Sequence, residues 1–295
     1  MTKDVLCIGS VLWDVIGRAS AAMRVGSDVP GRITRIPGGV AMNIAMTLRR
    51  FSMRPVLLSA VGRDEEGDEL IAAADRLGME TGFVYRSDDL PTDIYMAIEG
   101  ANGLIAAIAD AHSLEAAGAK ILRPLNDGRL GSEVAPFAGQ VALDGNLTEE
   151  LLTEIAGSPL FKKADLRVAP ASPGKAERLM PLLNCPNATI YVNLEEAGLL
   201  CNASFTTAPE AASALLERGA AHILVTDGGS AAAHASAAGV LTATPPAVLV
   251  TRVTGAGDTF MAAHMAAEAR GDTPGSALNA ALRAAAAYVS GDVPS

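Results

Sequence analysis

The sequence predicts an α/β fold built on a mostly parallel sheet with helices on both of its faces. Short apolar runs alternate with helical segments through most of the chain, as they do in βαβ units. Hydrophobic residues make up 49% of the 295 residues, which is enough for a large core. No linker, internal repeat or low-complexity tract interrupts residues 1–295, so we expect a single domain.

The first half of the chain predicts strands that leave the central sheet and return to it. Turn residues separate the short runs, and Gly78 stands where it would end a helix. The expected elements are strands at Val5–Gly9, Val11–Gly17 and Arg32–Ile36, a helix at Gly39–Phe51, a strand at Val56–Val61, a helix at Glu66–Leu77, a strand at Phe83–Arg86 and a hairpin of Asp93–Glu99 with Leu104–Ala109.

The second half predicts strands and helices in alternation, with ligands expected beyond the carboxyl ends of the strands. The stretch Gly118–Gln140 gives no clear prediction. The expected elements are strand Val141–Asp144, helix Thr148–Ala156, strand Leu166–Ala169, helix Pro173–Leu183, strand Thr189–Asn193, helices Leu194–Leu200 and Ala208–Arg218, strand His222–Thr226, a hairpin of Ala231–Ala235 with Val240–Thr244, and two helices after Asp258 and Thr273.

Charge and cysteine content narrow the class of protein. The net charge of −10 argues against nucleic acid or an anionic membrane as a partner, although backbone amides and Mg²⁺ can still bind ATP in an acidic protein. Three cysteines fit neither a disulfide framework nor a metal site, so we expect a cytoplasmic protein. The N-terminus predicts a strand, not a signal peptide, and no apolar run is long enough to span a membrane.

The stretch Val250–Phe260 contains the most informative motif. Its β-branched run, followed by Gly255-Ala256-Gly257, predicts a strand, a tight turn and a helix N-terminus that would attract an anion. Asp258 would repel that anion unless it acts as a general base on an attacking hydroxyl. It is equally compatible with a helix cap, and the stretch alone leaves both interpretations open.

A second glycine element, Pro37-Gly38-Gly39-Val40-Ala41-Met42-Asn43, distinguishes the two interpretations. Together the two motifs resemble those of the PfkB (ribokinase-like) carbohydrate and nucleoside kinases, and the resemblance covers essentially the whole chain. It implies a three-layer α/β/α sandwich with a small lid of β-strands from about residues 11–37 and 93–109.

The resemblance implies an ATP-dependent kinase that uses Mg²⁺. It assigns Asp258 as the general base, and the backbone amides of Gly255, Ala256 and Gly257 as groups that stabilise the transferring phosphoryl group. Positioning and electrostatics would supply most of the rate in such a transfer.

The sugar side of the site is assigned in the same way. Asp14 would accept hydrogen bonds from two sugar hydroxyls, and Gly38, Gly39 and Asn43 would complete the pocket. Without the resemblance, Asp14 is equally compatible with a turn, and a glycine pair before a helix more often only begins that helix. Trp13 either walls the pocket or packs in the core.

Two polar motifs resemble the nucleotide side of the family's site, and a third resembles an Asp-x-Asn element of the family. Asn193 and Glu196 match an Asn-x-x-Glu motif that orients Mg²⁺-phosphate through water, and Thr226 and Gly228 match a nucleotide loop. Asp144-Gly145-Asn146 is assigned to the mouth of the site. In isolation the first motif is more typical of a helix cap, and the second of a hairpin turn.

Motifs of other nucleotide-binding and catalytic classes are missing from the sequence. There is no P-loop, no protein-kinase motif set and no Gly-x-Gly-x-x-Gly after the first strand. His112, His222, His234 and His264 show no metal spacing, and we interpret them as structural.

Arg252 departs from the family pattern. Relatives usually place at this position an Asp that helps to hold an activating monovalent cation. An arginine would occupy that site with its own charge, so we expect no dependence on K⁺.

Three segments favour the pseudouridine kinase branch as the substrate class. They are Gly103–Asp110 with Leu114-Glu115, Leu143–Leu147 and Pro170–Ala176, although this branch usually has Met where the chain has Ala111. Ribose, ketose and other nucleoside kinases share much of the scaffold and remain alternatives.

Two other classes of protein compete with a kinase. A non-catalytic sugar or nucleoside sensor would not need Asp258, and a nucleoside hydrolase would need an Asp/His cluster that the sequence does not suggest. The lid strands would contact the sugar and pair with the lid of a second subunit, so a homodimer is expected.

Overall fold

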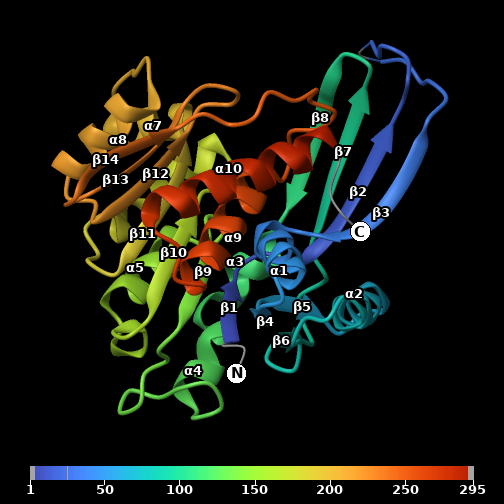
Figure 1. The fold of residues 1–295 in the computed structure, drawn as a ribbon. Helices are drawn as coiled ribbons and strands as arrows, with labels where there is room; N and C mark the ends of the chain where they lie inside the picture. The colour runs from blue at the N-terminus through green and yellow to red at the C-terminus, as the bar shows by residue number, and fades with distance from the viewer. Residues whose placement is uncertain (1–3, 25, 292–295) are drawn as a thin grey trace.

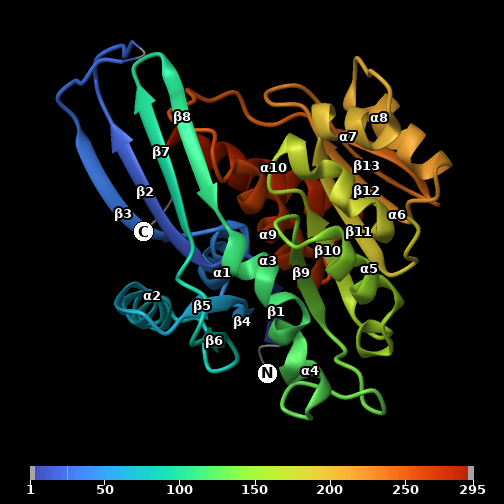
Figure 2. The same cartoon turned by 180° about the vertical axis from the view of Figure 1, so that it is seen from behind.

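The computed structural model describes residues 4–24 and 26–291 (Figures 1 and 2). The strands are β1 (Asp4–Ile8), β2 (Leu12–Arg18), β3 (Arg32–Gly38), β4 (Arg54–Leu58), β5 (Ala60–Gly62), β6 (Tyr85–Ser87), β7 (Ile94–Gly100), β8 (Gly103–Asp110), β9 (Gln140–Asp144), β10 (Asp165–Ala169), β11 (Ala188–Asn193), β12 (His222–Thr226), β13 (Ala232–Ser236) and β14 (Gly239–Ala243). The helices are α1 (Val40–Arg50), α2 (Glu65–Arg76), α3 (His112–Ala117), α4 (Arg123–Asn126), α5 (Glu149–Gly157), α6 (Met180–Leu183), α7 (Leu194–Cys201), α8 (Ala208–Glu217), α9 (Ala256–Ala269) and α10 (Pro274–Ser290), with 3₁₀ helices η1 (Gly118–Leu122), η2 (Pro159–Phe161) and η3 (Pro173–Leu179).

An eight-stranded sheet forms the middle layer, in the order β14-β13-β12-β11-β10-β9-β1-β4. Its neighbouring strands pair in parallel except at one edge, where β13 pairs antiparallel with both β12 and β14. Alternate residues of β1 face two separate cores: Leu6 and Ile8 pack with α3 to α8, and Val5 and Cys7 pack with α1, α2, α9 and α10. Helices therefore cover both faces, and the predicted three-layer arrangement is confirmed.

A second sheet of four strands, in the order β3-β2-β7-β8, projects from the body of the molecule (Figures 1 and 2). These strands are the ones expected as a lid from about residues 11–37 and 93–109. Strands β2 and β7 are parallel, and the two outer pairs are antiparallel. We call this sheet the lid sheet.

Local sequence explains several helix boundaries. The carboxylate of Asp64 accepts a 2.8 Å hydrogen bond from the Gly67 amide and caps α2, and Thr273 caps α10 in the same way. Gly78 and Gly291 follow the last turns of these helices with φ of 86° and 85°, a conformation that favours glycine.

Two expected elements are divided in the structure. The run at Val56–Val61 becomes β4, in the central sheet, and β5, which pairs with β6 in a small separate sheet. The expected helix at Pro173–Leu183 is η3 followed by α6. Pro181 has no N–H to donate to the preceding turn, so a continuous α-helix through it is unfavourable.

The prediction of a strand before Gly255 is wrong. Residues 244–253 are irregular, and Leu249 and Val253 are 82% and 71% exposed. The amide of Thr251 donates a 2.8 Å hydrogen bond to the Val289 carbonyl at the end of α10, so this donor is satisfied by a helix and not by a neighbouring strand.

Two further observations bear on the class of protein. None of the helices in residues 4–24 and 26–291 is both long enough and apolar enough to cross a membrane. Cys7, Cys185 and Cys201 are all free thiols.

Candidate active site

Two side chains from opposite ends of the sequence meet beside the central sheet. The Asn43 side-chain amide, on α1, donates a 3.0 Å hydrogen bond to the carboxylate of Asp258, in the first turn of α9. The two helices pack against each other in the same core cluster. The structure thus brings together a residue predicted to bind the sugar and the residue predicted to act as a base.

The N-terminus of α9 depends on Gly255. This residue has φ of 87°, and an added Cβ would lie 2.5 Å from the Tyr288 hydroxyl, which donates to the Thr254 carbonyl. Gly257, by contrast, is exposed, and a Cβ there would meet no atom within 4 Å. Open space therefore adjoins the start of the helix, where unpaired amides and the helix dipole attract anions.

Asp258 does not act as the helix cap. The N-cap position belongs to Gly255, and no side chain in the described chain forms a cap hydrogen bond there. The amide of Ala256 already donates to the Val253 carbonyl at 3.0 Å. Of the three amides predicted to hold phosphate, this one is engaged within the turn in this arrangement.

The ionisation of Asp258 is shifted toward neutral pH. Burial raises the pKa of Asp258 to about 7, the charges of Asp144, Asp14 and Glu196 act in the same direction, and the hydrogen bond from Asn43 opposes them. A carboxylate with a pKa near the working pH is well suited to general base catalysis.

Asp14 lies against the backbone of Gly38 on the neighbouring strand. An added Cβ on Gly38 would lie only 2.1 Å from Asp14 Oδ2, so this carboxylate fills the space of the missing side chain. Burial raises the pKa of Asp14 to about 6. Gly38 therefore sets the position of Asp14, which is a constraint that the sequence pattern did not reveal.

The start of α1 is held by Ser10. Its hydroxyl accepts a 2.9 Å hydrogen bond from the Val40 amide, and its carbonyl would be 2.5 Å from a Cβ on Gly39, whose φ is 94°. Gly39 is thus required by both space and conformation. Ser10 was missed in the sequence, although its place directly after a strand-ending Gly9 was an available signal.

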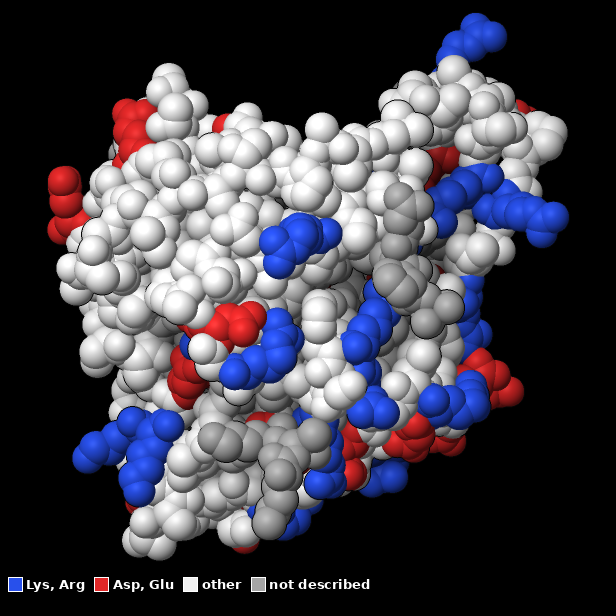
Figure 3. All heavy atoms as spheres, viewed as in Figure 1, with Lys and Arg blue, Asp and Glu red and all other residues white. Residues whose placement is uncertain are grey.

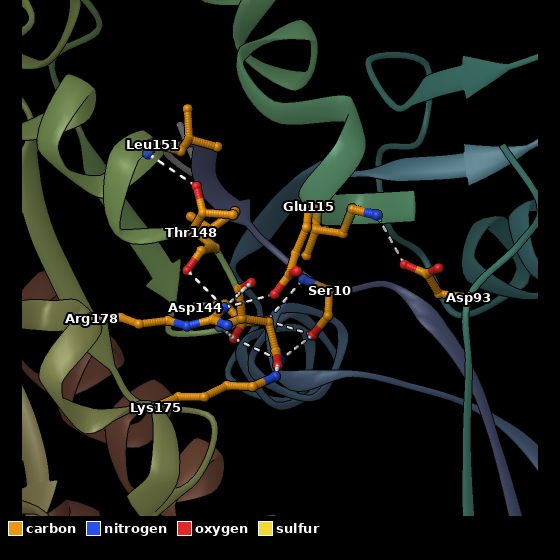
Figure 4. Close-up of polar contacts among 11 residues, drawn as sticks. Ser10, Asp93, Glu115, Asp144, Thr148, Leu151, Lys175 and Arg178 are labelled. Atoms are coloured by element: carbon orange, nitrogen blue, oxygen red, sulfur yellow. Dashed lines mark hydrogen bonds and ion pairs between the residues drawn. The ribbon is translucent and has the colours of Figure 1, made fainter. Parts of the chain in front are cut away.

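The predicted element Asp144-Gly145-Asn146 forms the centre of a polar cluster (Figure 4). Asp144 is fully buried, and its carboxylate accepts hydrogen bonds from the amide and the hydroxyl of Ser10 and from the backbone and side-chain amides of Asn146. A Cβ on Gly9 would lie 2.2 Å from Asp144. The cluster joins the ends of β1 and β9, and Asp144 itself is enclosed by protein.

Two basic side chains from the segment after β10 complete this cluster (Figure 4). Lys175 Nζ donates a 2.6 Å hydrogen bond to the Asn146 side-chain oxygen. Arg178 forms a 2.9 Å ion pair with Glu115 and donates to the Asn146 carbonyl at 3.2 Å. Neither was predicted as a site residue, because the contacts join segments that are far apart in the sequence.

Asn193 and Glu196 form a capping box at the start of α7. Each side chain accepts a hydrogen bond of 2.8 Å from the backbone amide of the other residue. Burial raises the pKa of Glu196, which is only 7% exposed, to about 7. The structural interpretation of this motif is therefore correct at the level of local geometry.

The same motif provides one carboxylate that could bind Mg²⁺ together with phosphate and water. One Glu196 carboxylate oxygen accepts a hydrogen bond from the Asn193 backbone amide. The negative charge of Glu196 also raises the pKa of Asp258, so the two carboxylates interact electrostatically. No group of three or more His, Cys, Asp and Glu residues in the described chain could hold a metal. Mg²⁺ often binds one or two carboxylates together with substrate phosphates and water, and Glu196 fits that pattern.

Thr226 and Gly228 lie at the end of the next strand. Thr226 is in register with Asn193 across β11 and β12, so these two residues share one edge of the sheet. Gly228 follows in a turn closed by a 2.8 Å hydrogen bond from Ser230 to Asp227. It has φ of 52°, and a Cβ there would meet open space.

Arg252 and Trp13 each have a defined structural contact. The Arg252 guanidinium lies 3.9 Å from the centre of the Tyr288 ring and donates a 2.8 Å hydrogen bond to its carbonyl. The Trp13 indole donates to the Glu66 carbonyl on α2 at 2.9 Å, and Arg35 lies over its ring. Trp13 thus links the lid sheet to α2, which favours the packing interpretation.

Comparisons with known proteins identify related chains. A family model described as pfkB family carbohydrate kinase matches residues 2–292. A pseudouridine kinase of Escherichia coli (strain K12) is 28% identical over 270 residues, which are 88% of this chain and 82% of that protein. A ribokinase of Mus musculus is 26% identical over 272 residues, which are 88% of this chain and 80% of that protein.

A solved structure supports the fold. The ribokinase of Arabidopsis thaliana, complexed with ribose and ATP, superposes with a TM-score of 0.77 and 19% identity, covering 100% of this chain and 94% of that chain. The ribokinase-like fold expected from the two glycine motifs is confirmed.

Proposed function

Since this chain belongs to the pfkB family of carbohydrate kinases, we propose that it transfers the γ-phosphoryl group of ATP to the 5′-hydroxyl of pseudouridine. One observation carries the kinase proposal: the Asp258 carboxylate lies at the start of α9, is hydrogen-bonded by Asn43 and has a pKa of about 7. A binding protein has no need of such a base.

Asp258 removes the proton from the attacking hydroxyl. The hydroxyl oxygen then forms a bond to the γ-phosphorus as the bond to the bridging oxygen of ADP breaks, and the proton remains on the carboxylate until solvent removes it. Amides at the start of α9, including that of Gly257, stabilise charge on the transferring group. Asp14 and Asn43 hold the sugar hydroxyls.

ATP binds along the edge of the sheet that contains Asn193, Thr226 and Gly228. Glu196 would hold Mg²⁺ through water, and the metal would neutralise phosphate charge when bound. The shared position of Asn193 and Thr226 at the ends of β11 and β12 supports this assignment.

The substrate assignment depends on three segments that resemble the pseudouridine kinase branch. They are the hairpin at Gly103–Asp110, Leu143–Leu147 and Pro170–Ala176. The first of these segments is strand β8 of the lid hairpin. The second and third segments meet in the polar cluster, where Lys175 donates a hydrogen bond to Asn146. The likeness to a ribokinase makes ribose the second candidate acceptor.

The lid sheet is proposed to pair with that of a second subunit. On one face of this sheet Ile33 and Ile108 are 80% and 70% exposed, and Met96, which is opposite Ile108, is 47% exposed. We infer that each chain is a single kinase domain, and that two chains form a homodimer in which this face of the lid sheet is covered. Light scattering of the Ile108→Asp variant should show monomers; an unchanged dimer would contradict this interface.

Arg252 is proposed to make K⁺ unnecessary. Its guanidinium donates to the Tyr288 carbonyl and lies on the Tyr288 ring, so a fixed cation is already present at the end of α10. Activity should be the same in potassium and in a large organic cation. Strong activation by potassium would overturn this proposal.

The decisive experiment is ADP production from MgATP with a panel of acceptors: pseudouridine, uridine, adenosine, ribose, fructose 6-phosphate and 2-keto-3-deoxygluconate. Turnover confined to pseudouridine supports both the reaction and the substrate. Turnover with free sugars alone would agree with the proposed mechanism but would overturn the assignment of pseudouridine as the substrate. Binding without turnover of any acceptor would indicate a sensor.

A further inference from the structure

A basic groove lies between two segments that flank the lid hairpin in the sequence. Its volume is about 550 Å³, and five of its eleven lining residues are Lys or Arg, against one Asp. This is unusual in a chain with a net charge of −10. Strand β6 and helix α4, which contribute to the groove, lie low in the molecule, away from the tip of the lid sheet (Figures 1 and 2).

The cations of the groove surround an aromatic ring. Lys120 Nζ lies 5.6 Å from the centre of the Tyr85 ring, and the Arg123 guanidinium lies 5.7 Å from it. Arg129 lies 5.8 Å from the centre of the Phe83 ring. Both aromatic rings are partly exposed. An aromatic face next to clustered cations combines a surface for base stacking with donors for phosphate.

The cations of the groove differ in their pairing. Arg63, Arg86 and Arg129 form ion pairs with aspartates at 3.0, 2.7 and 2.7 Å. In the part of the chain that the structure describes, Lys120 and Arg123 form no ion pair within 4.0 Å. Lys120 interacts electrostatically with the exposed Asp89 without forming an ion pair with it. These two positive charges therefore remain available to an anion, and they lie on the same wall of the groove.

We propose that this groove binds a mononucleotide, with its base against Tyr85 and Phe83 and its phosphate on Lys120 and Arg123. The volume suits a ligand of this size. The groove uses none of the residues assigned to phosphoryl transfer, so it is a second site and does not depend on the identity of the kinase substrate.

The connections of the groove link it to the lid. From Tyr85 the chain runs through residues 88–93 into β7, and from β8 it runs through α3 and η1 to Arg123. The Asp93 carboxylate joins the two connections, because it accepts hydrogen bonds of 3.0 Å from the amides of Ser113 and Leu114. A ligand that contacts both walls would bind the two ends of the lid hairpin together.

The position of binding is tested by photo-crosslinking with 8-azido-adenosine 5′-monophosphate, followed by trypsin digestion. A label on the peptide from residue 77 to Arg86, which contains Phe83 and Tyr85, is expected. Loss of that label in the Lys120→Ala/Arg123→Ala variant, and its retention in the exposed Lys162→Ala control, would support the proposal. A label confined to other peptides would overturn it.

Affinity is tested by calorimetry with adenosine and uridine 5′-monophosphates, ribose 5-phosphate and inorganic phosphate. We expect the nucleotides to bind about tenfold more tightly than ribose 5-phosphate, because the base stacks on an aromatic ring. We expect the double alanine variant to lose at least about tenfold in nucleotide affinity at this site. If all of these phosphates bind equally, the groove is an anion site and the proposal that it recognises a nucleotide is overturned. If the double variant binds nucleotides as tightly as the native protein, the proposed site itself is overturned. Kinase activity is not used as a readout, so these outcomes are independent of the reaction.

Discussion

The Asn43 side-chain amide and the Asp258 carboxylate are hydrogen-bonded at 3.0 Å although 215 positions separate them in the chain. The bond fixes the orientation of the carboxylate at the start of α9. It also stabilises the charged form, which opposes the effect of burial on the Asp258 pKa. One contact thus joins a residue proposed to bind the sugar to the residue proposed to accept the proton.

Replacement of Asp258 by Asn should abolish most of the activity. We expect kcat to fall by at least about 100-fold, because a general base contributes roughly that much. A carboxylate whose folded pKa exceeds its unfolded value destabilises the fold when it is charged, so the melting temperature at pH 8 should not fall. ADP production and thermal unfolding provide the two measurements. A kcat near that of the native enzyme would remove Asp258 from the mechanism.

The pH dependence should show the Asp258 titration. Because the active base is unprotonated and its pKa is about 7, kcat/KM should fall about tenfold per pH unit below 7 and level off above it. The decline should steepen below pH 6, where Asp14 is also protonated. In the Asn43→Ala variant, the midpoint near pH 7 in the kcat/KM profile should move to higher pH, because the hydrogen bond that lowers the pKa of Asp258 is lost. An unchanged midpoint would mean that this bond does not control the base.

Gly38→Ala should weaken acceptor binding through Asp14. The new Cβ would lie 2.1 Å from the Asp14 carboxylate, which must move. Loss of a charged hydrogen bond to a sugar hydroxyl should raise the acceptor KM by about tenfold or more and leave the KM for ATP unchanged. Gly17→Ala in β2 is the matched control, since its Cβ would have no neighbour nearer than 3.9 Å. Equal effects of the two variants would refute the steric argument.

His264 should make the fold sensitive to acid. It is fully buried, its Nδ1 lies 2.9 Å from the Tyr191 hydroxyl, and burial lowers its pKa to about 3, with Arg167 acting in the same direction. The folded state therefore resists protonation while the unfolded chain takes up a proton below pH 6.5. The free energy of unfolding should therefore decrease as the pH falls from 6.5 toward 3. At pH 5 we expect this contribution of His264 to lower it by about 2 kcal/mol.

Urea unfolding at pH 7.5 and pH 5 measures this loss. The His264→Gln variant should show a decrease smaller by about that amount, because glutamine does not titrate. Equal decreases in the two proteins would show that other groups are responsible.

Short strands and amphipathic helices could be predicted because their patterns are local. The strand predicted from Val250 up to Gly255 is absent for a long-range reason. Its β-branched residues predict a strand, but the amides of Thr251 and Arg252 donate to the Val289 carbonyl at the end of α10, and among the described residues no strand pairs with this segment. The break at Pro181 was readable from the residue itself. Proline has no amide to donate to the preceding turn, although the apolar spacing continues through it.

The candidate site was predictable where a motif carries its own geometry. Gly255 to Asp258 and Gly38 to Asn43 are such cases. Ser10 and Lys175 were not found, since their partners Asp144 and Asn146 are brought to them only by the packing of β1 against β9 and by the segment after β10. Gly9 matters for a similar reason, because its missing side chain leaves the space that Asp144 occupies.

The order of elements along the chain has a consequence for biosynthesis. Asp258 lies on α9, and Gly255 depends on space next to Tyr288 in α10, the last helix. A nascent chain that has folded β1 to β12 still lacks both, whatever else it has built. Catalytic competence should therefore appear only after both helices have left the ribosome, when α9 packs against α1 and α10 packs against α9. Fragments that end before α9 should be inert even if their sheet has formed.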